Sequence, residues 1–320
     1  MKKIKKLISL LLALTLAVGL VCTLSLGAGA AGKKLTDEER QALIASAEKY
    51  VTEGKTAEAE QRWSDAGAAY AKAAVYYGKA EDKENRSASA EKAAAMYEKA
   101  VNAYEQSETP VTDPDALCGV AEVYRALGSV YQRELKNAEK AKVNYAAAAK
   151  LYASAAALYE TAAAQSKNEK DAAKLNAAAA TAYGTAGYIY SEEAKDAGAA
   201  AEIYLKAAAL YAELEDGENE TKAKQAAAEA YMKAGEYYAG AAVGQYETAK
   251  EMYLKASALY TELGVEVKAQ EAAELAEKAG SGIGLASVLS YGEPWILISV
   301  TVIAAAVIAI LVVKKKKKTA

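Results

Sequence analysis

The chain repeats one alanine- and tyrosine-rich stretch. AAEIYLKAAALYAEL at 200–214 returns as AKEMYLKASALYTEL at 249–263 with eleven of fifteen positions identical, and looser copies occupy 93–104 and 148–159. Each copy has two tyrosines seven positions apart, which is nearly two turns of an α-helix, so both lie on one face. In a β-strand, residues seven apart would point to opposite faces. The repeated unit is therefore a helix, and its tyrosine pairs are Tyr97/Tyr104, Tyr152/Tyr159, Tyr204/Tyr211 and Tyr253/Tyr260.

A second kind of helix alternates with the first. Its pattern is Y-x2-[AL]-G-x2-Y, at 124–131, 183–190 and 231–238, with a form led by tryptophan at 63–70. Glycine at a helix crossing lets two backbones approach closely, and a tyrosine beside it fills the space that remains. The two patterns together predict helix pairs that stack on one another. The predicted packing residues are Trp63, Gly67, Tyr70, Tyr124, Gly128, Tyr131, Tyr183, Gly187, Tyr190, Tyr204, Tyr211, Tyr231, Gly235, Tyr238, Tyr253 and Tyr260.

These patterns resemble the tetratricopeptide repeat (TPR), whose helix pairs follow W-x2-L-G-x2-Y and then A-x3-F. Tyrosine mostly replaces both aromatic residues here, since the chain has no phenylalanine. The step between equivalent helices is about 50 residues, longer than the 34 of that repeat, and long hairpins of this composition look like the SNAP adaptor family. The resemblance covers roughly 56–280 and implies an all-α, right-handed solenoid of stacked antiparallel helix pairs (TPR/SNAP-like) that binds proteins.

Helix signals run almost without a break from Thr36 to Ala279. Thr36 and Glu39 form a capping box, and Gly54 is expected to end the first helix. No stretch alternates with period two, so no sheet is expected. The segment 265–279 carries charges around a short apolar stripe, as the polar cap of a stack would. The further predicted helices are 56–80, 88–107, 114–135, 138–165, 168–195, 197–214, 219–241, 246–262 and 265–279.

Both ends of the chain predict export and anchoring. MKKIKK, an apolar run and the A-x-A sequence at 28–30 predict a signal peptide over 1–30. The uncharged segment 295–313 is long enough for one transmembrane helix, and five lysines follow it in the tail 314–320. Lysines beside a span stay in the cytoplasm, so the helical domain 31–280 and the flexible tether 281–294 are predicted outside it. The predicted location is the cytoplasmic membrane, as a single-pass protein.

Composition argues against catalysis and against nucleic acid. The chain has 39 Lys and Arg, of which four precede residue 31 and five follow residue 313, whereas all 42 Asp and Glu lie between. This acidic middle disfavours nucleic-acid binding. The chain has no histidine and, once Cys22 is removed, only Cys118, which is expected to be a small buried helix residue. The acidic run 215–220 lacks ordered calcium-ligand spacing. We therefore predict a protein that is not an enzyme, with no cofactor and no metal site.

Two adjacent tyrosine pairs suggest binding residues. Neighbours on a helix point about 100° apart, so both members of Tyr76-Tyr77 or Tyr237-Tyr238 cannot face the core. Tyr76 and Tyr237 are the predicted anchors for a partner, because an exposed aromatic ring offers a large rigid contact area.

Two glycosylation sequons occur in the segment predicted to be exported. Asn85-Arg86-Ser87 and Asn219-Glu220-Thr221 both fall in predicted exposed loops, at 81–85 and 215–219. Asn85 and Asn219 are therefore possible glycosylation sites.

Two functions fit these features. The first is a membrane-anchored scaffold that binds a protein or peptide partner in the cell envelope. The second is a structural spacer, or a surface-layer or stalk component that self-associates. The sequence leaves the oligomeric state open.

Overall fold

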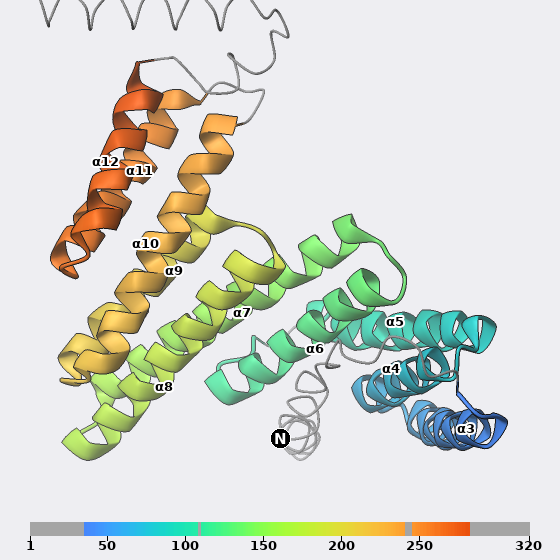
Figure 1. Cartoon of the computed structure of the whole chain (residues 1–320). Coiled ribbons are helices and arrows are strands. Elements are labelled where there is room, and N and C mark those ends of the chain that lie inside the picture. The colour runs from blue at the N-terminus through green and yellow to red at the C-terminus, as the bar shows by residue number, and fades with distance from the viewer. Residues whose placement is uncertain (1–34, 108–109, 241–244, 282–320) are drawn as a thin grey trace, which may run out of the picture. The chain divides into compact units, whose positions relative to one another are not determined.

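The computed structural model describes residues 35–107, 110–240 and 245–281 (Figure 1). These residues form helices and short connections, with no strand among them, which confirms the all-α prediction. No helix of the described part is long and apolar enough to cross a membrane. The predicted signal peptide, transmembrane helix and tail, and all but the first residue of the predicted tether, lie outside the described residues.

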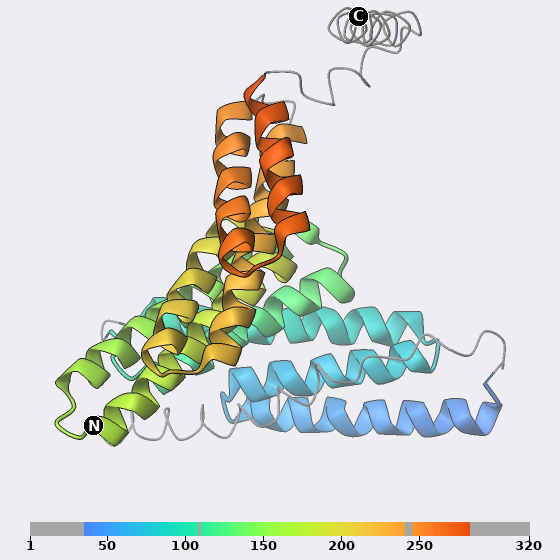
Figure 2. The same ribbon diagram turned by 60° about the vertical axis from the view of Figure 1, so that its left-hand side comes forward.

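Helices follow one another along the chain, and the described residues divide into two units. The first unit extends to Ala227 and the second begins at Ala228, inside α10. Within the first unit α3, α4 and α5 lie side by side (Figure 2), and α7 packs against both α6 and α8. The elements are α3 (Asp37–Ala59), α4 (Trp63–Lys79), α5 (Lys83–Glu105), α6 (Pro114–Arg133), α7 (Ala138–Gln165), α8 (Glu169–Tyr188), the π-helix η1 (Ile189–Glu193), α9 (Ala197–Glu213), α10 (Gly217–Gly240), α11 (Tyr246–Glu262) and α12 (Glu266–Gly280).

One tight turn recurs between successive helices. In each of these turns, a residue with positive φ follows the end of the first helix. The N–H group of the next residue then bonds back into that helix, as Asp82 N does to Tyr77 O at 2.9 Å and Asp216 N to Tyr211 O at 2.9 Å. These are the bonds of a helix C-cap, and they reverse the chain within three residues. Only one of the six positions is a glycine. They are Gln61, Glu81, Lys136, Lys195, Glu215 and Gly264.

The first predicted boundary is wrong. α3 continues through Gly54 to Ala59, and the break before α4 falls at Gln61, which has a φ of 57°. Gly54 is buried, and a Cβ placed on it would lie 2.9 Å from a ring carbon of Tyr70. Gly54 is therefore a contact glycine within a helix, and the predicted helix 56–80 begins only at Trp63.

The two sequons do not lie in loops. α5 begins at Lys83 and α10 at Gly217, so Asn85 and Asn219 are in the first turns of helices. Their side-chain Nδ2 atoms donate to Asp82 Oδ2 at 2.8 Å and to Asp216 Oδ2 at 2.7 Å. The prediction that both sequons lie in loops is therefore wrong. An aspartate N-cap, Asp82 or Asp216, starts each helix earlier than expected. Glycosylation of these residues stays a prediction.

Glycine-to-tyrosine contacts hold neighbouring helices together. In five helix pairs a glycine of one helix lies under the tyrosine ring of the next, and an added Cβ would come within 2.6–2.9 Å of that ring. Backbone and ring thus approach as closely as packing allows. The pairs are Gly54/Tyr70, Gly67/Tyr97, Gly128/Tyr145, Gly187/Tyr204 and Gly235/Tyr253.

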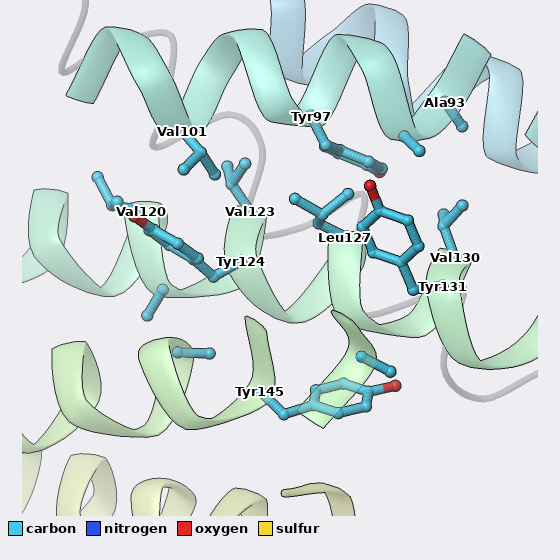
Figure 3. Packing of buried hydrophobic residues seen from close by; sticks show 14 of the residues in the cluster. Ala93, Tyr97, Val101, Val120, Val123, Tyr124, Leu127, Val130, Tyr131 and Tyr145 are labelled. Carbon is cyan, nitrogen blue, oxygen red and sulfur yellow. The ribbon is translucent and has the colours of Figure 1, made fainter. Parts of the chain in front are cut away.

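The core of the first unit is richest around α6. Figure 3 shows Leu127 and Tyr131 pointing from α6 toward Tyr97 of α5, while Tyr145 of α7 lies on the other side of α6. Tyr145 is 3% exposed. Elsewhere the core consists mostly of alanine and tyrosine, so α6 supplies the largest share of branched aliphatic side chains.

The predicted packing residues are buried or half-buried. Tyr70, Tyr124, Tyr131, Tyr183, Tyr231, Tyr253 and Tyr260 are buried, as are Gly67, Gly128, Gly187 and Gly235, whereas Trp63, Tyr190, Tyr204, Tyr211 and Tyr238 are half-buried. In the second unit, the charged residues of α12 that were expected to form a polar cap are all exposed, and Ala269, Ala272, Ala276 and Ala279 face inward.

Candidate binding groove

Buried tyrosines of the first unit direct their hydroxyls to acidic residues. Tyr70 Oη donates to Glu58 at 3.1 Å, Tyr124 to Glu105 at 2.6 Å and Tyr183 to Glu160 at 2.6 Å. Sequence reasoning missed these acids, because the separation along the chain varies between 12 and 44 positions. The further pairs of this kind are Tyr131/Glu98, Tyr152/Glu122 and Tyr159/Asp115.

In the helices that carry the Y-x2-[AL]-G-x2-Y pattern or its form led by tryptophan, a lysine of the following helix lies over the leading aromatic ring, with one exception. Lys99 Nζ is 4.6 Å from the Trp63 ring centroid, Lys206 is 5.4 Å from that of Tyr183, and Lys255 is 5.3 Å from that of Tyr231. Each of these lysines stands two positions after the tyrosine of its own helix that covers a glycine of the preceding helix, which is Tyr97, Tyr204 or Tyr253. In α7 that position is Ala147, so the α6–α7 pair departs from the pattern.

An open groove crosses this divergent pair. It lies over α7 between α6 and α8, which flank α7 (Figure 1). Its volume is about 370 Å³, which is within the range of ligand sites in proteins. The lining residues are Cys118 of α6, Tyr152 and Tyr159 of α7, and Ala177, Ala178, Thr181, Ala182 and Thr185 of α8.

The lining of the groove offers few kinds of polar contact. Thr181 Oγ1 donates to Ala177 O at 2.8 Å and Thr185 Oγ1 to Thr181 O at 2.9 Å, so both hydroxyl protons are used within α8. The hydroxyls of Tyr152 and Tyr159 donate to Glu122 and Asp115. The lining therefore offers a ligand small apolar surfaces, ring faces and acceptor oxygens, and few donors.

Acids adjoin the Tyr159 end of the groove, and an ion pair lies further along α6. At one end Asp115 accepts from Tyr159, and Asp113 Oδ1 accepts from Asp115 N at 3.0 Å. Burial, followed by the bond to Asp115, raises the pKa of Tyr159 well above its ordinary value. Further along α6, Arg125 Nη2 and Nε bind Glu193 at 2.7 and 2.9 Å.

Beyond the residues that line the groove, α8 is interrupted. The sequence predicts one helix over 168–195, but the structure changes to a π-helix at Ile189, with Ala194 N bonded to Ile189 O at 2.8 Å. Glu193 lies in this π-turn and forms the ion pair with Arg125 from α6. The guanidinium carbon of Arg125 is also 5.9 Å from the ring centroid of Tyr188, which is 47% exposed.

The thiol of Cys118 lines this groove. It is half-buried on α6, close to its expected environment. Burial, and then the nearby Asp115 and Glu122, raise the pKa of its thiol to about 12. The thiol is therefore protonated at neutral pH, and a protonated thiol is a poor nucleophile.

The second unit has a similar groove that is lined by an ion pair of its own. It lies over Tyr260 of α11, between Glu229, Met232 and Lys233 of α10 and Lys268 and Glu271 of α12, and its volume is about 250 Å³. Lys268 Nζ lies 3.3 Å from Glu229 Oε1 and 5.3 Å from the Tyr260 ring centroid. Tyr260 occupies the same place in the repeat as Tyr159.

The two predicted anchors differ in exposure. Tyr237 is 71% exposed, and its ring meets that of Tyr238 edge-on at 5.4 Å. Tyr76 is half-buried and stacks on Tyr50 at 5.4 Å. Neither residue lines the α6–α8 groove, which the sequence analysis did not identify.

Among the described residues, no group of three or more His, Cys, Asp or Glu could hold a metal ion. The acidic run at 215–220 contains the turn residue Glu215 and the first helical turn of α10.

Two solved structures are among those that this chain matches. No protein-family model matches the sequence, and the search of curated proteins gives no match. The crystal structure of BtubC (BKLC) from P. vanneervenii is 19% identical, with 76% of this chain and 92% of that chain covered and a TM-score of 0.32. The TPR2AB domain of yeast Sti1, in its complex with pHSP90, is 20% identical, with 74% and 99% covered and a TM-score of 0.17. Such TM-scores define no common arrangement of helices, so the groove itself carries the functional argument.

Proposed function

We propose that the protein is a non-enzymatic, membrane-anchored scaffold that binds an extended segment of a protein partner in the cell envelope. The groove between α6 and α8 carries this proposal, because it is preformed and crosses the one helix pair of the first unit that departs from the repeat. In repeat proteins, shared positions hold neighbours together and concave surfaces bind partners. A TPR/SNAP-like right-handed solenoid is part of the proposal and rests on the sequence patterns.

The lining suits a polypeptide segment. Ala177, Ala178 and Thr181 are small, so a partner backbone can approach α8 closely. Tyr152 and Tyr159 add rigid aromatic contacts at low cost in conformational entropy. Both rings are fixed by their hydroxyl bonds to acids, so the surface is already organised before a partner arrives.

The location is proposed from the sequence alone. The signal-like segment 1–30, the apolar segment 295–313 and the lysine-rich end 314–320 support a single-pass protein whose helical domain is outside the cytoplasm. Tyr237 and Tyr76 are proposed as further contact residues, with Tyr237 the more accessible.

A blocking substitution tests the groove. Ala178→Trp should fill it, whereas Val143→Trp adds the same side chain at a 68% exposed position of α7. Full-length protein with each change is used to capture partners from a membrane-fraction extract. We expect Ala178→Trp to reduce capture of a specific partner at least about tenfold and Val143→Trp to leave it unchanged.

Equal capture by the two variants would show that the groove does not bind the partner. Capture of further copies of the same chain, with no other protein enriched, would favour a self-associating spacer or stalk.

A further inference from the structure

Three of the six tyrosine–carboxylate pairs described above hold a lysine over the ring, whereas Tyr124 with Glu105, outside the groove, does not. Tyr70, Tyr131 and Tyr183 donate to Glu58, Glu98 and Glu160, and Lys92, Lys140 and Lys206 lie 5.4, 4.7 and 5.4 Å from the respective ring centroids. The combination has a physical cause. The ring face and the carboxylate both attract a cation, and the hydroxyl bond holds them in fixed relation.

One pair in the groove lacks this lysine. Tyr159 donates to Asp115, but among the described residues no lysine or arginine lies over its ring and none pairs with Asp113 or Asp115. The other pair of the groove, Tyr152 with Glu122, already has Arg125 Nη1 at 3.9 Å from Glu122. Of the two tyrosine–carboxylate pairs in the groove, only the one at the Tyr159 end therefore has no basic side chain of the described residues beside it.

In the groove of the second unit, a lysine of the protein itself occupies the position over the corresponding tyrosine ring. There Tyr260, the equivalent of Tyr159, holds Lys268, which also pairs with Glu229. That cation comes from the protein's own α12. Over α7, the corresponding part of α8 presents Ala177, Ala178 and Thr181, none of which carries a charge.

We infer that the groove between α6 and α8 binds a lysine or arginine side chain of the partner, with its cationic group at Asp115 and Asp113 and its aliphatic stem on the Tyr159 ring. The backbone of the partner segment lies along Ala177, Ala178 and Thr181, whose small side chains allow it to approach α8 closely. This inference rests on the proposed function and adds the chemistry of the ligand.

The acids are held ready for this contact. Asp113 caps α6 by accepting from Asp115 N, and Asp115 accepts from Tyr159, so both carboxylates have defined positions. The partner is thus expected to be basic where it meets this end of the groove, in agreement with the acidic excess of the region between residues 31 and 313.

Two labelled peptides test the inference with full-length protein. One is a short alanine–threonine peptide with a central lysine, and the other replaces that lysine with uncharged norleucine. Fluorescence anisotropy should give about tenfold tighter binding of the lysine peptide at low salt. Asp115→Asn, which keeps an acceptor for Tyr159, should abolish that preference. Glu58→Gln, the same change in a pair that already holds a lysine, should keep it.

The remaining outcomes separate the two proposals. Equal binding of both peptides by the unaltered protein would overturn the cation site and leave the peptide groove standing. Equal loss in Asp115→Asn and Glu58→Gln would reduce the preference to general charge and overturn the site as well. Binding of neither peptide would overturn both proposals. Dimers of the chain that the peptide does not displace, and that Ala178→Trp dissociates, would assign the groove to a second copy instead.

Discussion

At the scale of single residues, glycine and tyrosine have complementary roles in helix packing. Glycine removes a side chain where two helices cross, and the tyrosine of the next helix covers the place with its ring. The hydroxyl of Tyr70 remains at the edge, where it donates a hydrogen bond to Glu58, and that of Tyr145 donates to Gln132 Oε1 at 3.0 Å. A phenylalanine could fill the same space but could not make this bond, which accounts for the preference for tyrosine.

Two glycines of α8 provide a matched test of the crossings. A Cβ on Gly187 would lie 2.8 Å from a ring carbon of Tyr204, whereas a Cβ on Gly184 would meet nothing within 4 Å. Gly187→Ala should lower the free energy of unfolding by about 1–3 kcal/mol through overpacking. Gly184→Ala should raise it by up to about 1 kcal/mol through helix propensity. Chemical denaturation measures both, and changes of equal sign would contradict the predicted contact.

The adjacent tyrosines of α10 separate binding from folding. Tyr237 is 71% exposed, whereas Tyr238 packs against the cluster that contains Ala249 and Tyr253. Tyr237→Ala should leave the melting temperature nearly unchanged and weaken partner capture by about 1–2 kcal/mol. Tyr238→Ala should lower the free energy of unfolding by about 1–3 kcal/mol. Unfolding caused by Tyr237→Ala, or unaltered capture, would remove Tyr237 from the binding surface.

At the scale of helices, the recurring turn explains both the regular return of the chain and the errors in predicted boundaries. The helices themselves were predictable, because alanine-rich segments with tyrosines seven apart admit no other regular structure. The breaks at 81–85 and 215–219 were also located, but the conformation of the turns was not predictable, because Gln61 and Glu81 adopt positive φ where glycine is the usual signal. Gly54, which looked like a helix end, is a packing position instead.

The turn between α9 and α10 tests this reading of the backbone. Glu215 has a φ of 57°, which costs an ordinary residue roughly 1–2 kcal/mol. Glu215→Gly should therefore raise the free energy of unfolding, by up to about 1 kcal/mol after the added flexibility of the unfolded chain is counted. Ala209→Gly, at an exposed position within α9, should lower it by about 1 kcal/mol. Destabilisation by both changes would contradict a strained turn.

The groove could not be predicted from the sequence, because it depends on contacts between residues that are far apart along the chain. The repeat frame identifies Tyr152 and Tyr159 as members of a tyrosine pair, but it does not show that α8 opposes them with small residues. Nor does it pair Tyr159 with Asp115, 44 positions away. The one signal that was available is the loss of the repeated lysine at Ala147, which marks the α6–α7 pair as different.

At the scale of the whole molecule, the many tyrosines set the alkaline limit of stability. Burial, as the largest cause, raises the pKa of Tyr70 and that of Tyr145 to about 12, from a usual value of 10. The same cause raises the pKa of Tyr124, Tyr152 and Tyr183. Folded tyrosines therefore keep protons that unfolded ones lose, so the stabilisation is complete below pH 10 and falls as the pH rises toward 12.

Denaturation at a series of alkaline pH values measures this effect. Each tyrosine that ionises only in the unfolded chain should lower the free energy of unfolding by up to about 1.4 kcal/mol per pH unit above pH 10. The last part of the rise in tyrosinate absorbance should coincide with the loss of helix content measured by circular dichroism. Ionisation of all tyrosines near pH 10 without loss of helix would show that the buried hydroxyls are not held as described.

The central claim is that the α6–α8 groove contacts a protein partner at the membrane. A photo-crosslinking amino acid at Thr181, in the groove, and at Val143, on the exposed part of α7, tests it in intact cells. We predict one crosslinked product with a different protein from Thr181, its loss on Ala178→Trp, and no such product from Val143. The same products from both positions, or none but copies of this chain from Thr181, would contradict the claim.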